Sequence, residues 1–141
     1  MRPLVLLSGA VALLAIAGGA YLLSGGDAGR TTTGSGTPMA SVTVPELSGE
    51  LARGRELFDA SCASCHGANA AGRAGIAPPL VHMIYEPGHH ADGAFFLAAA
   101  RGVRQHHWSF GDMPAVPDVT PQEVAAITAY VRALQRASGI F

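Results

Sequence analysis

The chain has 141 residues, which is enough for one ordinary domain and too few for two. Nine arginines, with no lysine, nearly balance ten acidic residues; the net charge of -1 and the lack of a basic block exclude nucleic acid as the main partner. Two cysteines cannot build a disulfide scaffold, and the 49% hydrophobic content is concentrated at the N-terminus and in alanine.

The N-terminal segment is the first predicted element. After Arg2, residues Leu4–Leu23 form a run of 20 residues without a charge, of which 16 are apolar. A helix of this length spans about 30 Å, the thickness of the hydrocarbon layer of a membrane. We therefore predict a membrane anchor over residues 1–24, with the N-terminus in the cytoplasm. A cleaved signal peptide is one alternative, since the small residues at 15–20 could form a cleavage site for signal peptidase. A buried core helix is another.

A linker and one helical domain are predicted after the anchor. Residues 25–46 are rich in Gly, Thr and Ser, which is typical of a flexible spacer without contacts of its own. The domain is expected over residues 47–141. Its first helix is predicted over 48–61, where apolar and small residues recur at helical spacing, namely Leu47, Leu51, Gly54 and Phe58.

Two further helices follow in the predicted domain. One covers Asp92–Arg101 and ends before Gly102. The other begins with Thr120-Pro121-Gln122-Glu123, which combines a capping box with proline in the first turn, and ends near Gly139. Since no stretch alternates with period two, the domain is predicted to be all-α. Long loops at 67–91 and 102–119 indicate that the chain wraps around something.

The sequence Cys62-Ala63-Ser64-Cys65-His66 carries the chemistry. Cys-x-x-Cys-His is the attachment signal for c-type haem. The two thiols can reach the two vinyl groups on one edge of the porphyrin, and the adjacent histidine is then held against the iron. A thioredoxin-like motif would need a strand–helix context, a zinc site would need further ligands, and a disulfide across two residues would be strained.

Residues 48–141 resemble a class I c-type cytochrome of the small bacterial monohaem type. Gly54 and Phe58 match the residues that let the N-terminal helix of that family cross the C-terminal helix, where Ile127 and Tyr130 match the partner positions. The resemblance implies three to four helices around one covalently bound haem.

The resemblance also implies the residues that hold the haem. Pro78, twelve residues after His66, matches a proline whose carbonyl accepts the histidine Nδ1 hydrogen, and Leu80 matches a leucine that packs on the haem. Met113, in Gly-Asp-Met-Pro, matches the methionine that is the sixth iron ligand. Trp108 matches an indole that donates a hydrogen bond to a haem propionate. Met83 is the alternative methionine, but it follows His66 by only 17 residues, which is too soon to cross to the distal face.

Histidine and methionine ligation implies a one-electron carrier rather than an enzyme, because both axial positions are filled and no small-molecule substrate can bind. The expected setting is the bacterial inner membrane, with the haem domain in the periplasm and redox proteins as partners: a respiratory complex, an oxidase or a dehydrogenase. A sensor of gas or peroxide, in which Met113 dissociates, is the alternative.

Five histidines are not accounted for by this resemblance: His82, His89, His90, His106 and His107. They are solvated or line the haem pocket in the simplest interpretation. A second interpretation has His106 or His107 replace Met113 on the iron. A third is an additional site for copper or a similar metal, with Met83 assisting, as in a copper-binding accessory protein.

Overall fold

The computed structural model describes residues 36–141; the predicted anchor and residues 25–35 of the predicted linker lie outside the described residues. The elements follow the chain in the order α2 (Glu50–Ser61), α3 (Ala63–His66), η1 (Ala68–Ala70), η2 (Met83–Tyr85), α4 (Asp92–Arg101) and α5 (Pro121–Ala137), where η marks a short 3₁₀ helix. From residue 36 onward, β pairing is confined to two isolated bridges, Arg73–Ala77 and Val103–Met113. The prediction of an all-α domain with three to four helices is confirmed. None of the helices between residues 36 and 141 has the length and hydropathy needed to span a bilayer.

The helix boundaries follow from local sequence signals. The predicted capping box forms at α5: the Glu123 backbone N–H donates to Thr120 Oγ1 at 3.3 Å, and the Thr120 N–H donates to Glu123 Oε2 at 2.9 Å. The helix predicted over Asp92–Arg101 is observed as α4 with the same bounds. The helix predicted over 48–61 is observed as α2, which begins at Glu50 rather than at residue 48. Short-range signals were therefore sufficient to place the three longest helices.

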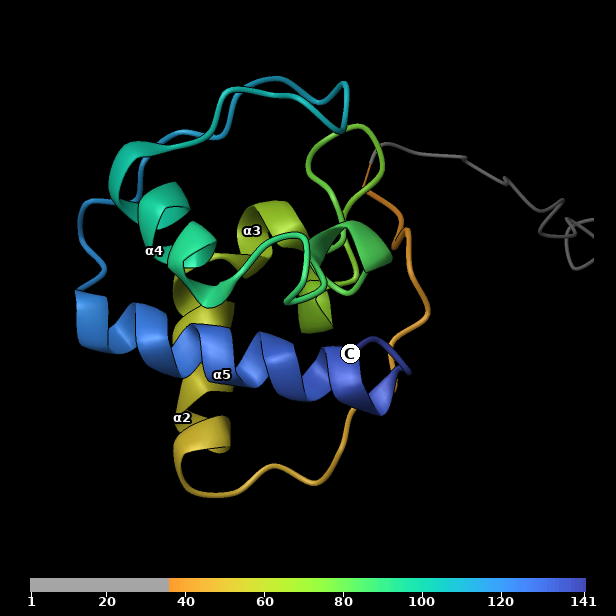
Figure 1. The fold of residues 1–141 in the computed structure, drawn as a ribbon, viewed down its shortest axis with the longest axis vertical. Coiled ribbons are helices and arrows are strands. Elements are labelled where there is room, and N and C mark those ends of the chain that lie inside the picture. The colour runs from red at the N-terminus through yellow and green to blue at the C-terminus, as the bar shows by residue number, and fades with distance from the viewer. Residues whose placement is uncertain (1–35) are drawn as a thin grey trace, which may run out of the picture. The chain divides into compact units, whose positions relative to one another are not determined.

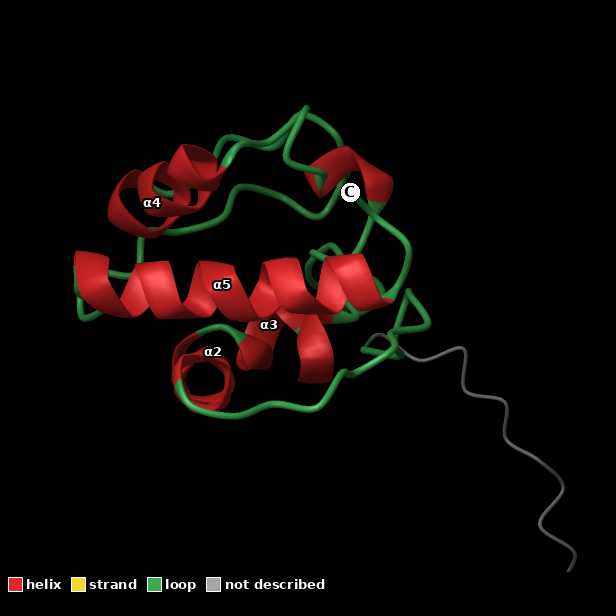
Figure 2. Cartoon of the chain, turned by 60° about the horizontal axis from the view of Figure 1, so that its bottom comes forward, coloured by secondary structure: helices red, strands yellow, loops and turns green. Residues whose placement is uncertain are grey.

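Helix α5 is the centre of the domain and packs against α2 and α4 (Figures 1 and 2). Where α2 crosses α5, a Cβ atom on Gly54 would lie 2.2 Å from the Ala126 carbonyl oxygen and 3.0 Å from Tyr130 Cβ. The glycine therefore lets the two backbones approach closely. Beside it, the fully buried rings of Phe58 and Tyr130 pack at a centroid distance of 5.7 Å. The crossing of Gly54 and Phe58 with Ile127 and Tyr130 agrees with the predicted helix contact.

A buried arginine on α5 fixes the loop that leads into α4. Arg132 is 5% exposed, and its Nε donates to Asp92 Oδ1 at 2.7 Å. Its other nitrogens donate to the backbone carbonyls of Tyr85 and His90 and to Gln135 Oε1. One cationic side chain thus satisfies polar groups from η2, from the following loop and from α5 itself.

We expect Arg132→Met to lower the free energy of unfolding by about 2 kcal/mol, because the His90 carbonyl and the Gln135 side chain lose a buried donor. Urea unfolding followed by circular dichroism measures this loss. Asp92→Asn is the matched control: the Asp92 side chain is 64% exposed, so removing its charge should cost less than about 1 kcal/mol. A larger loss in the control would show that the ion pair, rather than the carbonyl contacts, stabilises this loop.

The segment 36–46 differs from the spacer without contacts that its composition predicts. Its backbone N–H groups donate to the loop after the Cys-x-x-Cys-His motif and to the C-terminus: Gly36 to Ala74 O at 2.7 Å, Met39 to Ala71 O at 2.9 Å and Thr43 to Ser138 Oγ at 3.1 Å. Val42 packs against the hydrophobic core. These residues are therefore part of the folded domain. Their small and polar side chains did not indicate this, because most of the contacts are made by the backbone.

Candidate haem site

A cavity of about 550 Å³ has its walls in α2, α4, α5 and both long loops. Its size is within the range of small-molecule and cofactor sites. All the site residues named from the sequence line it: Cys62, Cys65, His66, Pro78, Leu80, Trp108 and Met113. The fold thus brings the Cys-x-x-Cys-His motif together with residues far along the chain.

Cys62 follows the last residue of α2, and Cys65 lies in the short helix α3 that comes next. The Cys62 N–H donates to Phe58 O at 2.8 Å, and the His66 N–H donates to Cys62 O at 2.9 Å, so the helical hydrogen bonds continue through the motif. Both thiols are free. Burial, followed by the neighbouring Cys65 sulfur, raises the pKa of Cys62 to about 11. At neutral pH the free Cys62 thiol is therefore protonated. Over residues 36–141 neither cysteine belongs to a group of three or more potential metal ligands, which does not favour the zinc site considered above.

His66 is buried at 8% exposure, and its ring is held by one hydrogen bond. Its Nδ1 lies 2.9 Å from the Pro78 carbonyl oxygen, the contact that the resemblance implies. Burial lowers the pKa of His66, and the Pro78 hydrogen bond opposes this change. The imidazole is therefore neutral at pH 7, with its hydrogen on Nδ1 and the lone pair of Nε2 free to bind iron.

The loop that carries Pro78 folds back at a glycine. Gly72 has a φ of +75°, and a Cβ atom there would lie 2.5 Å from the Pro79 nitrogen. Its N–H donates to His66 O at 2.7 Å. Since only glycine fits this conformation and this close approach without strain, Gly72 places the Pro78 carbonyl next to the His66 ring.

Met113 is held at the cavity by a backbone bridge. Its N–H and carbonyl both pair with Val103 at 2.9 Å, and Gly102, with a φ of +72°, allows the Met113 carbonyl to approach the end of α4. Met83 is 65% exposed, and neither it nor Met39 lines the cavity. Among the methionines of the part of the chain described here, Met113 alone reaches this site.

Trp108 has a buried indole nitrogen that needs a partner. The ring stacks on Phe110 at a centroid distance of 5.8 Å and an angle of 10°, and it meets His82 edge-on at 5.2 Å. The indole N–H lies close enough to the Tyr85 hydroxyl to oppose the rise in the Tyr85 pKa that burial causes, but it makes no well-aligned hydrogen bond to any residue from 36 to 141. A buried donor without an acceptor is costly, so an acceptor on a bound group would satisfy it.

The five remaining histidines lie in the two long loops, and three of them line the cavity. His82 Nδ1 accepts a hydrogen bond from the Ile84 N–H at 3.2 Å and so caps η2. His90, His106 and His107 line the cavity. His89 joins them through a contact of 3.3 Å between its Nε2 and that of His107. Partial desolvation, followed by the charges of the neighbouring histidines, lowers the pKa of His107.

A family model described as cytochrome c matches residues 51–135, which is more than half of the chain and includes most of the cavity wall. The chain belongs to the cytochrome c family. This confirms the resemblance to class I c-type cytochromes; it makes haem c the cofactor of the domain and haem-based electron transfer its class of activity.

Curated relatives of this cytochrome carry the name "cytochrome bc1 complex cytochrome c subunit". Those from Mycobacterium bovis and Mycobacterium tuberculosis are 41% identical over 75 residues, which is 53% of this chain and 24% of each relative. One from Mycobacterium leprae is 42% identical over 62 residues, covering 44% of this chain and 20% of the relative. The matched region thus spans about a quarter or less of these longer proteins.

The residues that line the cavity fit haem c. Two free thiols, a neutral histidine with an available Nε2, a methionine from another segment and an indole donor without an acceptor all face one mainly apolar space. The thiols could hold the vinyl groups, the histidine and the methionine could bind the iron, and the indole could donate to a propionate.

Sequence reasoning missed three residues that position this site. Arg132 holds the loop beside the cavity, and Gly72 and Gly102 allow the tight turns behind Pro78 and Met113. Arg132 did leave a signal, since it is a charge among the apolar residues of the predicted C-terminal helix. The two glycines left none, because the chain has 18 glycines and nothing local distinguishes these two.

Proposed function

We propose that this cytochrome carries single electrons through one haem c, attached by thioether bonds to Cys62 and Cys65, with His66 and Met113 as the axial ligands of the iron. One observation carries the proposal: the side chains of His66 and Met113, 47 positions apart in the sequence, line the same cavity as both thiols. When bound, the haem supplies a reversible Fe(III)/Fe(II) couple. His66 and Met113 would hold the iron from two segments of the chain, and the apolar residues of the cavity would surround the ring.

Two other arrangements of the sixth iron position are less well supported: a histidine ligand, and an open position as in a sensor. His106 and His107 are exposed, and the Nδ1 of His106 lies 2.9 Å from the Arg104 carbonyl oxygen. Met113 is instead anchored on both sides of its backbone by Val103. A sensor of gas or peroxide would require the Met113 sulfur to leave the iron by rotation of its side chain, and the carbon monoxide experiment below tests this. We therefore propose Met113, rather than a histidine, as the ligand opposite His66.

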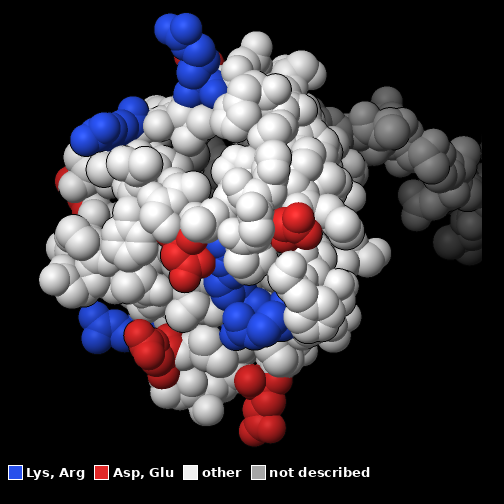
Figure 3. Space-filling view, in the orientation of Figure 1, with Lys and Arg blue, Asp and Glu red and all other residues white. Residues whose placement is uncertain are grey.

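The relatives suggest the partners. Because they are named as subunits of a bc1 complex, we propose that this domain exchanges electrons with membrane-bound respiratory proteins on the periplasmic side of a bacterial inner membrane. The chain has no lysine, and acidic and basic groups are scattered over the face shown in Figure 3, with a broad uncharged area between them. Docking through an uncharged surface suits this distribution better than a charged ring does.

Absorption spectra of the purified full chain test this proposal. In the oxidised protein we expect the weak sulfur-to-iron charge-transfer band that marks methionine ligation. The reduced protein should give the narrow bands of a six-coordinate c-type haem, unchanged by carbon monoxide at neutral pH. Haem should remain with the chain after denaturation and extraction, since thioether bonds hold it. Rapid carbon monoxide binding by the wild type would instead support the sensor, and absence of the sulfur band would contradict the Met113 assignment.

A further inference from the structure

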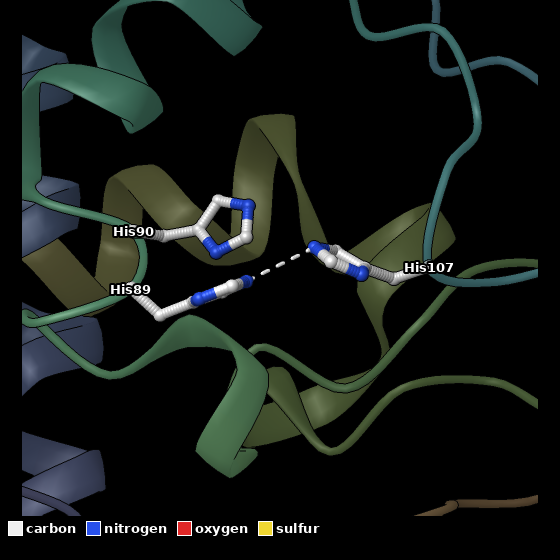
Figure 4. Close-up of side chains that lie close together, drawn as sticks. All are labelled: His89, His90 and His107. Carbon is white, nitrogen blue, oxygen red and sulfur yellow. Dashed lines mark hydrogen bonds between the residues drawn. The ribbon is translucent and has the colours of Figure 1, made fainter.

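Three imidazole rings from two separate loops face one another beside the haem cavity. His89 and His90 follow η2, and His107 belongs to the loop after α4. Figure 4 shows the three rings close together, with a nitrogen of His89 facing one of His107. One ring nitrogen from each lies within 4.8 Å of the others. Over residues 36–141 this is the one group of three or more His, Cys, Asp or Glu side chains so arranged.

The distance between two of these rings suits a metal ion. His89 Nε2 and His107 Nε2 lie 3.3 Å apart. Two nitrogens that each lie about 2.0–2.1 Å from a tetrahedral zinc ion are about 3.3–3.4 Å apart, so this pair is already at ligand spacing. The same distance also permits a simple hydrogen bond, in which one ring donates to the other, and the experiment below separates the two cases.

The His90 ring and its backbone are held in place by neighbours that are not ligands. Its Nδ1 donates to the Ile84 carbonyl at 2.6 Å, which leaves Nε2 as the nitrogen with a free lone pair. The backbone N–H groups of His89 and His90 both donate to Glu86 O, and Arg132 donates to His90 O. A histidine whose second nitrogen is bound to a backbone carbonyl is the usual arrangement in metal sites.

We propose that His89, His90 and His107 form a site for one divalent transition-metal ion of the Zn²⁺ or Cu²⁺ kind, with a fourth position left for water. Three imidazoles without a carboxylate favour these borderline ions over Mg²⁺ or Ca²⁺, which require oxygen ligands. The ion would join the loop before α4 to the loop that carries Trp108 and Met113. Because His90 and His107 also line the cavity, metal binding would tighten the protein wall next to the haem.

Calorimetric titration of the haem-loaded full chain, purified without a polyhistidine tag, tests the site. We expect one Zn²⁺ or Cu²⁺ per chain and no heat with Mg²⁺. His89→Ala and His107→Ala should each weaken Zn²⁺ binding by more than about tenfold, since loss of a direct ligand should cost at least as much as loss of an outer partner. His106→Ala is the matched control, because it removes a neighbouring exposed imidazole outside the triad, and it should keep the affinity of the wild type.

A second measurement, hydrogen exchange, tests whether the metal ion joins the loop before α4 to the loop after it. Zn²⁺ should slow hydrogen exchange of the backbone amides in residues 103–113, and this protection should be absent in His107→Ala. An unchanged haem spectrum in each variant shows that the domain is still folded. No saturable binding by the wild type, or an equal loss in His106→Ala, would overturn the proposal. The Met113 assignment is read from the sulfur-to-iron band and this site from the Zn²⁺ titration, so failure of one is distinguishable from failure of the other. A spectrum that placed His107 on the iron would contradict both.

Discussion

Replacement of Met113 by alanine is expected to convert a haem closed to ligands into one that binds carbon monoxide. Met113 lines the same cavity as His66, and no other methionine in the described part of the chain does so. Without its sulfur, the sixth position is left to water or to a weak ligand. Since a thioether favours ferrous iron, the midpoint potential should fall by an amount on the order of 0.1 V or more.

Three measurements check this expectation: the sulfur-to-iron band, the rate of carbon monoxide binding to the reduced protein, and the midpoint potential from a redox titration. Met83→Ala is the matched control, because Met83 is 65% exposed and does not line the cavity. The control should keep the band and the potential of the wild type. If Met113→Ala also kept both, another sulfur would have to be the sixth ligand. If the wild type lacked the band and Met113→Ala kept its potential, the loop histidines His106 and His107 would be the next candidates.

The Gly54→Ala substitution is expected to lower the free energy of unfolding by about 3 kcal/mol, although alanine normally stabilises a helix. The added Cβ would lie 2.2 Å from the Ala126 carbonyl oxygen, which belongs to the backbone of α5 and cannot rotate away. Helices α2 and α5 would have to separate along the contact that buries Phe58 and Tyr130. The steric cost therefore exceeds the gain in helix propensity, which is about 1 kcal/mol.

The matched control for this experiment is Gly93→Ala in α4. Gly93 is also a helical glycine, but a Cβ atom there meets nothing within 4 Å. Its replacement should leave stability unchanged or raise it by up to about 0.5 kcal/mol. Urea unfolding curves of both variants, with the m value compared, give the difference. Equal stability of the two variants would show that the close helix crossing does not exist in solution.

The success of the fold prediction depended on where each signal lies in the sequence. Thr120 and Glu123 act within a single turn, so the start of α5 could be recognised without knowledge of the fold. The contact of His66 with Pro78 spans a loop, and it was expected only because the motif resembles a known family. Local chemistry thus predicted the elements, and the resemblance predicted how the site is assembled from them.

The features that were not predicted depend on tertiary structure alone. The role of Arg132 comes from carbonyl groups 40 to 50 positions earlier in the chain, and no local pattern reveals them. Gly72 and Gly102 matter because other backbone segments approach them closely. The grouping of His89, His90 and His107 depends on the folding of two loops toward each other; the sequence indicated only that the chain is rich in histidine.

The attachment of residues 36–46 joins the two ends of the described fold. Thr43 contacts Ser138, just after α5, while Gly36 and Met39 contact the loop between the Cys-x-x-Cys-His motif and Pro78. A chain cut before residue 47 would therefore lose hydrogen bonds both at the C-terminus and next to the cavity. A fragment meant to keep this fold should begin at or before residue 36.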